Sequence, residues 1–107
     1  MVLNQEIIAI TETIKSAIPV ERIYLFGSHA NGTSSYKSDY DLFILIPDGG
    51  IKPLDAIREA RYSLIPLNRK TSIDILADYK SRFEKRSEFN TLERKVVEEG
   101  VVLYERA

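Results

Sequence analysis

The stretch Gly27-Ser-His-Ala-Asn-Gly-Thr-Ser-Ser-Tyr-Lys-Ser-Asp-Tyr-Asp-Leu42 decides the fold, because it connects two apolar segments that have the composition of buried β-strands. Residues 22–26 precede it as a short β-branched and aromatic run, and residues 41–46 follow it as a second run. Gly27 closes the first run, and a proline and two glycines close the second by residue 50. We expect the two ends of the connecting loop to meet in space and to form one site.

Helices and a third strand are expected around this unit. Apolar residues at intervals of three and four predict a helix over residues 3–18, which Pro19 ends. A second helix is predicted to begin at Pro53 and to end before Pro66, with one face formed on neighbouring turns by Leu54, Ile57, Arg61 and Leu64. Residues 72–77 return to strand character, and residues 101–104 predict a short edge strand.

Two more helices are predicted near the C-terminus from capping signals. Ser81 and Asn90 are each followed three positions later by a glutamate, a pattern typical of a capped helix start. We expect Asp78 to begin the first of these helices and Gly100 to end the second. The apolar stripe predicted for the last helix consists of Leu92, Val96 and Val97. This order predicts an α/β (α+β) fold, a small mixed β-sheet backed by helices.

Length and composition limit the function classes. The 107 residues have room for a single domain spanning 1–107, with 44% hydrophobic and 29% charged residues to fill one core and one surface. A net charge of -1 argues against general nucleic-acid binding. The absence of Cys excludes disulfides, thiol nucleophiles and Cys-ligated zinc. No apolar run approaches a membrane span, and no basic residue precedes Lys15, so we expect a cytoplasmic protein with no membrane association.

The two ends of the 27–42 stretch carry complementary chemistry. Gly27 has no Cβ, so its backbone can approach an anion, and the Ser28 hydroxyl can bond to a phosphate if the next residues turn into a short helix. Asp39 and Asp41 are two positions apart, so in an extended backbone both side chains leave the same face. The stretch therefore predicts a phosphate-binding site beside a pair of carboxylates.

A third acid completes the predicted site. Asp74 lies between Ile73 and Ile75 in the last main strand, where an unpaired acid facing an apolar core would be costly. If this strand lies beside that of Asp41, the three acids can hold two metal ions roughly 3.5 to 4 Å apart, an arrangement that stabilises in-line attack at phosphorus. Magnesium suits this role, because it binds a few carboxylates and leaves positions for water and substrate phosphates.

A Gly-Ser pair, ten residues, Asp-x-Asp-Leu and a later Asp in an apolar strand resemble the minimal nucleotidyltransferases of the DNA polymerase beta superfamily. The resemblance covers nearly the whole chain, including residues 98–105 at its end. It implies that Gly27 and Ser28 contact the phosphates of ATP and that Asp39 and Asp41 ligate the Mg²⁺ ions. By the same resemblance, Asp74 binds one metal and helps to deprotonate the attacking hydroxyl. Many members carry Arg where this chain has Asn31.

The resemblance also implies a partner. Small members of this family often act as antitoxins beside a helical HEPN protein, a ribonuclease toxin, and some transfer AMP from ATP to a tyrosine of that toxin. Two alternatives stay open: a non-catalytic subunit that neutralises its partner by binding alone, and an enzyme that modifies a small molecule of the antibiotic type across a homo-oligomer interface.

Other motifs carry weaker signals. The stretch from Gly27 to Ser34 nearly matches a P-loop, but Thr33 stands where the lysine that reaches the outer phosphates is needed, so we reject a P-loop. We expect the single histidine, His29, to be an exposed loop residue rather than a proton carrier. The basic stretch 80–86 contains Glu84 and is expected to be a solvated helix face.

Overall fold

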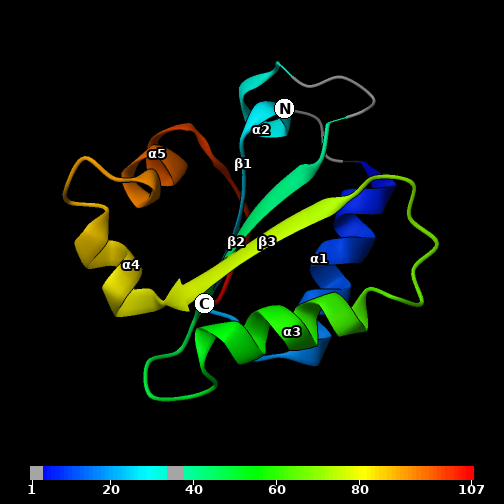
Figure 1. Ribbon diagram of the computed structural model, residues 1–107, viewed down its shortest axis with the longest axis horizontal. Helices are drawn as coiled ribbons and strands as arrows, with labels where there is room; N and C mark the ends of the chain where they lie inside the picture. The colour runs from blue at the N-terminus through cyan, green and yellow to red at the C-terminus, as the bar shows by residue number, and fades with distance from the viewer. Residues whose placement is uncertain (1–3, 34–37) are drawn as a thin grey trace.

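A computed structural model of the chain describes residues 4–33 and 38–107. The expected start of the first helix at Leu3 and the loop residues 34–37 lie outside the described residues. Over the described residues, the chain forms one four-stranded mixed sheet and five helices, which confirms the predicted fold class (Figure 1).

The sheet has the strand order β3-β2-β1-β4. Its strands are β1 (Arg22–Phe26), β2 (Tyr40–Ile46), β3 (Ile73–Tyr79) and β4 (Val101–Glu105). β1 pairs antiparallel with both β2 and β4, whereas β2 and β3 run parallel. All four predicted strands are confirmed, and the last one lies at an edge as expected.

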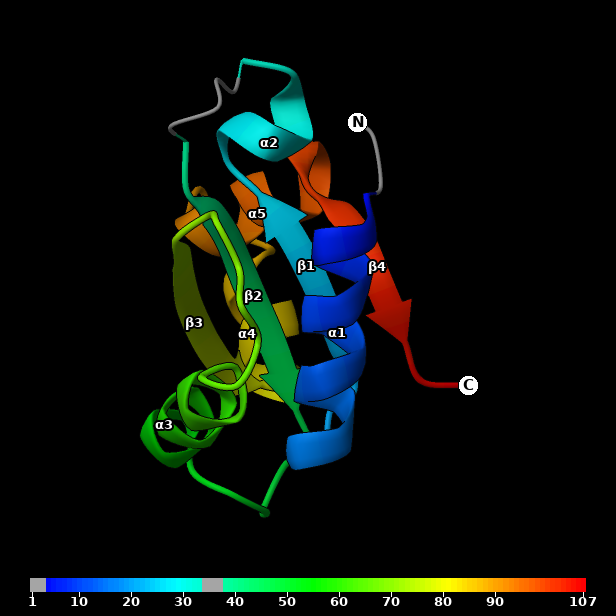
Figure 2. The ribbon, with the colours of Figure 1, turned by 90° about the vertical axis from the view of Figure 1, so that its right-hand side faces the viewer.

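Successive side chains of β2 point to opposite sheet faces, and both faces are buried because helices cover each of them. Leu42 and Ile44 pack on the face covered by α1 (Gln5–Ala17) and α3 (Pro53–Ser63), which we call the α1/α3 face. Phe43 and Leu45 pack on the face covered by α4 (Lys80–Arg86) and α5 (Leu92–Glu99), the α4/α5 face. Figure 2 shows the two helical layers on opposite sides of the sheet.

For the helices of the α1/α3 face, the sequence predicted the boundaries better than it predicted which residues are buried. Asn4 caps α1 by accepting a hydrogen bond from the Ile7 amide at 2.8 Å. In α3, Leu54 is 80% exposed, so its predicted place on the apolar face is wrong. Ala56 and Ala60 face the sheet instead and are fully buried, because small side chains allow the helix backbone to approach the strands.

The helices of the α4/α5 face begin at other residues than predicted. α4 starts at Lys80 without a side-chain cap, while the Ser81 hydroxyl hydrogen-bonds to the Asp48 carboxylate in the loop after β2. Asp78 stays in β3 and accepts a hydrogen bond from Arg82 Nε at 2.8 Å. Thr91, not Asn90, caps α5 by accepting a hydrogen bond from the Arg94 amide.

The inward contacts of these two helices are few. Phe83 of α4 lies 5.6 Å from the Tyr24 ring and 4.9 Å from the Phe43 ring, measured between centroids. Val96 is the buried apolar residue of α5, whereas Leu92 and Val97 are nearly half exposed, so the predicted three-residue stripe packs through one member. Gly100 ends α5 as predicted. Across the described ranges, none of the helices has the length and apolar character needed to traverse a lipid bilayer.

Candidate active site

The turn after β1 meets the condition that the sequence left open, a short helix directly after Gly27. Gly27 has φ 72° and ψ -154°, a region that essentially only glycine occupies. Its carbonyl oxygen accepts hydrogen bonds from the amides of Ala30 and Asn31 at 3.0 and 3.1 Å. The chain thereby enters the short helix α2 (Ser28–Asn31), which ends at Gly32 in the left-handed region. The Gly27–Ser28 pair therefore lies at the junction of β1 and α2.

Asp41 connects this junction to the third acid. In the sheet register, Asp41 lies opposite Phe26 of β1 and opposite Asp74 of β3. Because paired residues in neighbouring strands point to the same sheet face, both carboxylates belong to the α4/α5 face. The condition that the sequence left open, that β2 and β3 be neighbouring strands, is therefore met, and the pairing places Asp41 beside Asp74.

Gly27 lies directly against the Asp41 side chain. A Cβ added to Gly27 would lie 3.2 Å from Asp41 Cγ and would collide with Asp41 Oδ2. A side chain at position 27 would therefore fill the space that the carboxylate occupies. Glycine is required here by both backbone conformation and close approach.

The acids differ in exposure and share an electrostatic field. Asp41 is partly buried, whereas Asp39 and Asp74 are exposed. Burial, and then the negative charges of Asp74 and Asp39, raise the pKa of Asp41 above its ordinary value of 3.8, while His29 acts in the opposite direction. The repulsion shows that the three carboxylates are close enough to interact, and a cation among them would relieve it.

The donor set fits a hard divalent cation, since carboxylate oxygens are the ligands that Mg²⁺ prefers and the exposed side chains of Asp39 and Asp74 leave the acids accessible from solvent. However, within residues 4–33 and 38–107 no three acidic or histidine side chains are already arranged to hold a metal ion. The register brings the acids to one place without closing them around a common centre. Closing them requires side-chain rotation, which an exposed acid such as Asp74 can undergo.

Two residues of α2 have structural contacts that the sequence did not indicate. His29 is partly buried rather than exposed: Nε2 lies 2.9 Å from the Ser38 carbonyl oxygen, and its ring centroid lies 4.5 Å from that of Tyr40. It therefore ties α2 to the segment before β2. Asn31 Oδ1 accepts hydrogen bonds from the Thr33 amide and hydroxyl at 3.1 and 2.6 Å, which stabilises the end of α2.

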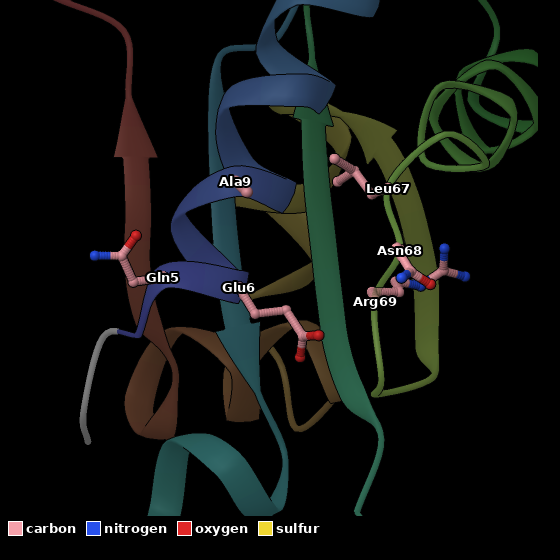
Figure 3. A pocket seen from close by; sticks show the side chains of 6 residues that line it. All are labelled: Gln5, Glu6, Ala9, Leu67, Asn68 and Arg69. Carbon is pink, nitrogen blue, oxygen red and sulfur yellow. The ribbon is translucent and has the colours of Figure 1, made fainter.

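A cavity of about 250 Å³ on the α1/α3 face is separate from this site (Figure 3). Glu6 and Arg69 contribute to it from α1 and from the segment before β3. The Lys70 amide donates to Glu6 Oε2 at 2.8 Å, and Arg69 Nη1 donates to the Leu64 carbonyl oxygen at 3.2 Å. None of the sequence-predicted site residues lines this cavity.

A second cavity, of about 170 Å³, borders the Gly27 junction. The wall opposite Gly27 is formed by α5, which is distant from Gly27 along the chain. The sequence predicted only an apolar packing stripe for this helix and no residue of the site. The side chains that sequence reasoning missed here are those of Phe26, Leu92 and Lys95. Spacing along the chain holds no signal for them, because only the docking of α5 brings them to the junction.

Comparison with known proteins identifies the class. Residues 8–107 match the family described as "Polymerase beta, Nucleotidyltransferase", so the chain belongs to that nucleotidyltransferase family. No curated protein is similar enough in sequence to count as a match.

Solved structures share the fold. A protein provisionally assigned as a nucleotidyltransferase from Sulfolobus solfataricus superimposes with a TM-score of 0.65 at 18% identity, over 94% of this chain and 78% of that one. A toxin–antitoxin crystallised with AMP-PNP gives a TM-score of 0.60 at 22% identity, over 96% of this chain and 75% of that one. A mutant of the toxin–antitoxin MntA-HpeT superimposes with a TM-score of 0.60 at 25% identity, over 98% of this chain and 75% of that one.

Proposed function

We propose that this protein is a Mg²⁺-dependent nucleotidyltransferase that transfers AMP from ATP to a hydroxyl group. The acceptor in this proposal is the hydroxyl of a tyrosine on a helical HEPN-type partner, and the protein acts as the antitoxin of that partner. The observation that carries the proposal is the register pairing of Asp41 with Asp74 directly beside Gly27. Family membership supports the reaction class, and a neighbour in fold that is a toxin–antitoxin crystallised with AMP-PNP supports the nucleotide and the partner.

Each residue has a role in this proposal. Gly27 would bind the phosphates through its backbone, since glycine carries no side chain of its own, and Ser28 would bind them through its hydroxyl. Asp39, Asp41 and Asp74 would hold the metal, which when bound neutralises phosphate charge and orients the reacting groups. Asp74 is exposed on β3, an edge strand of the sheet, and would accept the proton of the attacking hydroxyl. The new bond joins the acceptor oxygen to the α-phosphorus of ATP as the bond to pyrophosphate breaks.

One experiment tests the proposal. The protein is incubated with ATP, Mg²⁺ and the partner that co-purifies with it, and the intact mass of each chain is measured. We expect the partner to gain the mass of an adenylyl group with the wild type and no mass with Asp41→Asn. Asp55→Asn is the matched control, because Asp55 pairs with Arg58 on α3 and should leave the transfer unchanged.

A binding-only antitoxin is the second candidate, and exposed apolar residues on and after α3 favour it. Leu54, Tyr62 and Ile65 are each at least 69% exposed and offer a surface for another protein. If the complex forms equally well with Asp41→Asn and no mass changes in either case, binding alone neutralises the partner. Modification of a small hydroxylated molecule without any partner would favour the antibiotic-type enzyme.

A further inference from the structure

The cavity beside Gly27 lies between the end of β1, the short helix α2 and α5, with a volume of about 170 Å³. Apolar and polar residues both line it. The lining residues are Phe26, Gly27, Asn31, Leu92, Lys95, Val96 and Glu99.

The cavity is adjacent to the acid cluster. Phe26 lies opposite Asp41 in the sheet register, and Gly27 touches the Asp41 side chain so closely that no Cβ fits between them. Two of the residues that line the cavity are therefore direct neighbours of the Asp41 carboxylate. A ligand held at Gly27 in contact with this acid would extend into the cavity.

Lys95 has a charge that no partner uses. Its neighbour in α5, Arg94, forms an ion pair with Glu98 at 3.3 Å, and Arg86 of α4 forms one with Glu93 at 2.7 Å. Among the described residues, no carboxylate lies within the 4.0 Å ion-pair distance of the Lys95 ammonium. The ammonium is therefore available to a ligand in the cavity.

The charge balance indicates what that ligand is. Asp39, Asp41 and Asp74 supply negative charge for metal ions, and Mg²⁺ neutralises only part of the charge of a triphosphate. A lysine is a compact point charge suited to phosphate oxygens. Glu99 also lines the cavity and opposes phosphate binding there, so removing its charge should have the opposite effect to removing that of Lys95.

We propose that Lys95 binds the outer phosphates of the nucleoside triphosphate whose inner phosphate reacts beside Asp41. This inference rests on the proposed function, since it assigns a further residue to the same nucleotide. Lys95 is a binding residue here, because it lines the cavity together with Gly27, whereas none of the three acids lines it.

The test measures dissociation constants for ATP and for AMP, in Mg²⁺ at one salt concentration, by titration calorimetry. Lys95→Gln should weaken ATP binding about tenfold, as expected for one charge-assisted hydrogen bond, and should leave AMP binding unchanged. Lys95→Arg should retain most of the ATP affinity, and Glu99→Gln should increase it. Arg94→Gln is the matched control and should leave both affinities unchanged, because Arg94 is engaged by Glu98.

The outcomes separate this inference from the proposed function. If the wild type binds ATP and Lys95→Gln binds it equally well, the role of Lys95 is overturned and the proposed function is unaffected. If Lys95→Gln weakens ATP and AMP by the same factor, the contact is not with the outer phosphates. If the wild type binds neither nucleotide, both proposals are overturned. A shift of ATP affinity in opposite directions for Lys95→Gln and Glu99→Gln supports the inference even if one variant is less stable.

Discussion

The two faces of the sheet differ in how completely helices cover them. On the α1/α3 face, Ile10, Ile44 and Ala60 are all 0% exposed. The two helices cover this face of the sheet along the length of β2. On the α4/α5 face, the shorter helices seal the region over Phe43, but Leu76 of β3 is 40% exposed and Asp74 is exposed. The acids lie where the cover stops, because a carboxylate stays ionised at a lower cost in contact with water. One face therefore stabilises the fold, and the gap on the other face provides the site.

The largest effect is expected from removing the aromatic anchor of the α4/α5 face. Phe83→Ala should destabilise the protein by about 3–5 kcal/mol, because Phe83 is fully buried against Tyr24 and Phe43. In native-state hydrogen exchange, amides of α4 and α5 should lose protection before those of α1. Phe89→Ala, at a position 61% exposed, should change stability by less than about 0.5 kcal/mol. Equal loss of protection in α1 would show that the two faces unfold as one unit.

The next effect concerns the junction itself. Gly27→Ala should lower stability by about 1–3 kcal/mol for the backbone alone and further for the collision with Asp41, and should abolish nucleotidyl transfer. Gly32→Ala is the matched control: its φ is also positive, at 84°, but an added Cβ meets nothing within 4 Å. Thermal unfolding and the intact-mass assay measure both variants. Similar melting temperatures would contradict the close approach of Gly27 to Asp41.

A smaller effect tests the repulsion among the acids. Because the pKa of Asp41 is raised in the folded state, its contribution to stability is complete below pH 3.8 and is lost as the pH rises through the folded value. Without metal at neutral pH, Asp41→Asn should therefore melt at a higher temperature than the wild type, and Mg²⁺ should stabilise only the wild type. Identical melting of both proteins with and without Mg²⁺ would count against the cluster.

The smallest effect is expected at the ion pair between α4 and α5. Burial raises the pKa of Glu93, but hydrogen bonds, chiefly from Arg86, outweigh this and lower it below 4.5. A lowered folded pKa means that the stabilisation is present above the unfolded value and is lost as the pH falls through the folded value. The difference in melting temperature between wild type and Glu93→Gln should be present at pH 7 and vanish in strong acid. A difference that is independent of pH would assign the effect to packing alone.

Local sequence rules predicted elements better than contacts. The β1 boundaries and the end of α5 at Gly100 are as predicted, since each depends on residues adjacent in the chain. The sequence left the short helix after Gly27 as a condition of phosphate binding, and the structure meets that condition. The caps at Ser81 and Asn90 are wrong, because Asp48 hydrogen-bonds to Ser81 across the fold and Thr91 is one residue closer to the helix. Periodicity could not distinguish Leu54 from Ala56 as the buried position of α3, because that depends on how closely the helix approaches the sheet.

By itself, the sequence determined the elements and the chemical types at the site: a glycine-serine turn, two acids at alternate positions and a third acid in an apolar strand. Only the tertiary structure decided that Asp74 lies beside Asp41, since the parallel pairing of β2 and β3 sets that register. It also decided that Lys95 lines a cavity with Gly27. The physical reason is the range of the interactions: turns and strands depend on neighbouring residues, whereas register and helix docking depend on burial of apolar surface across the whole chain.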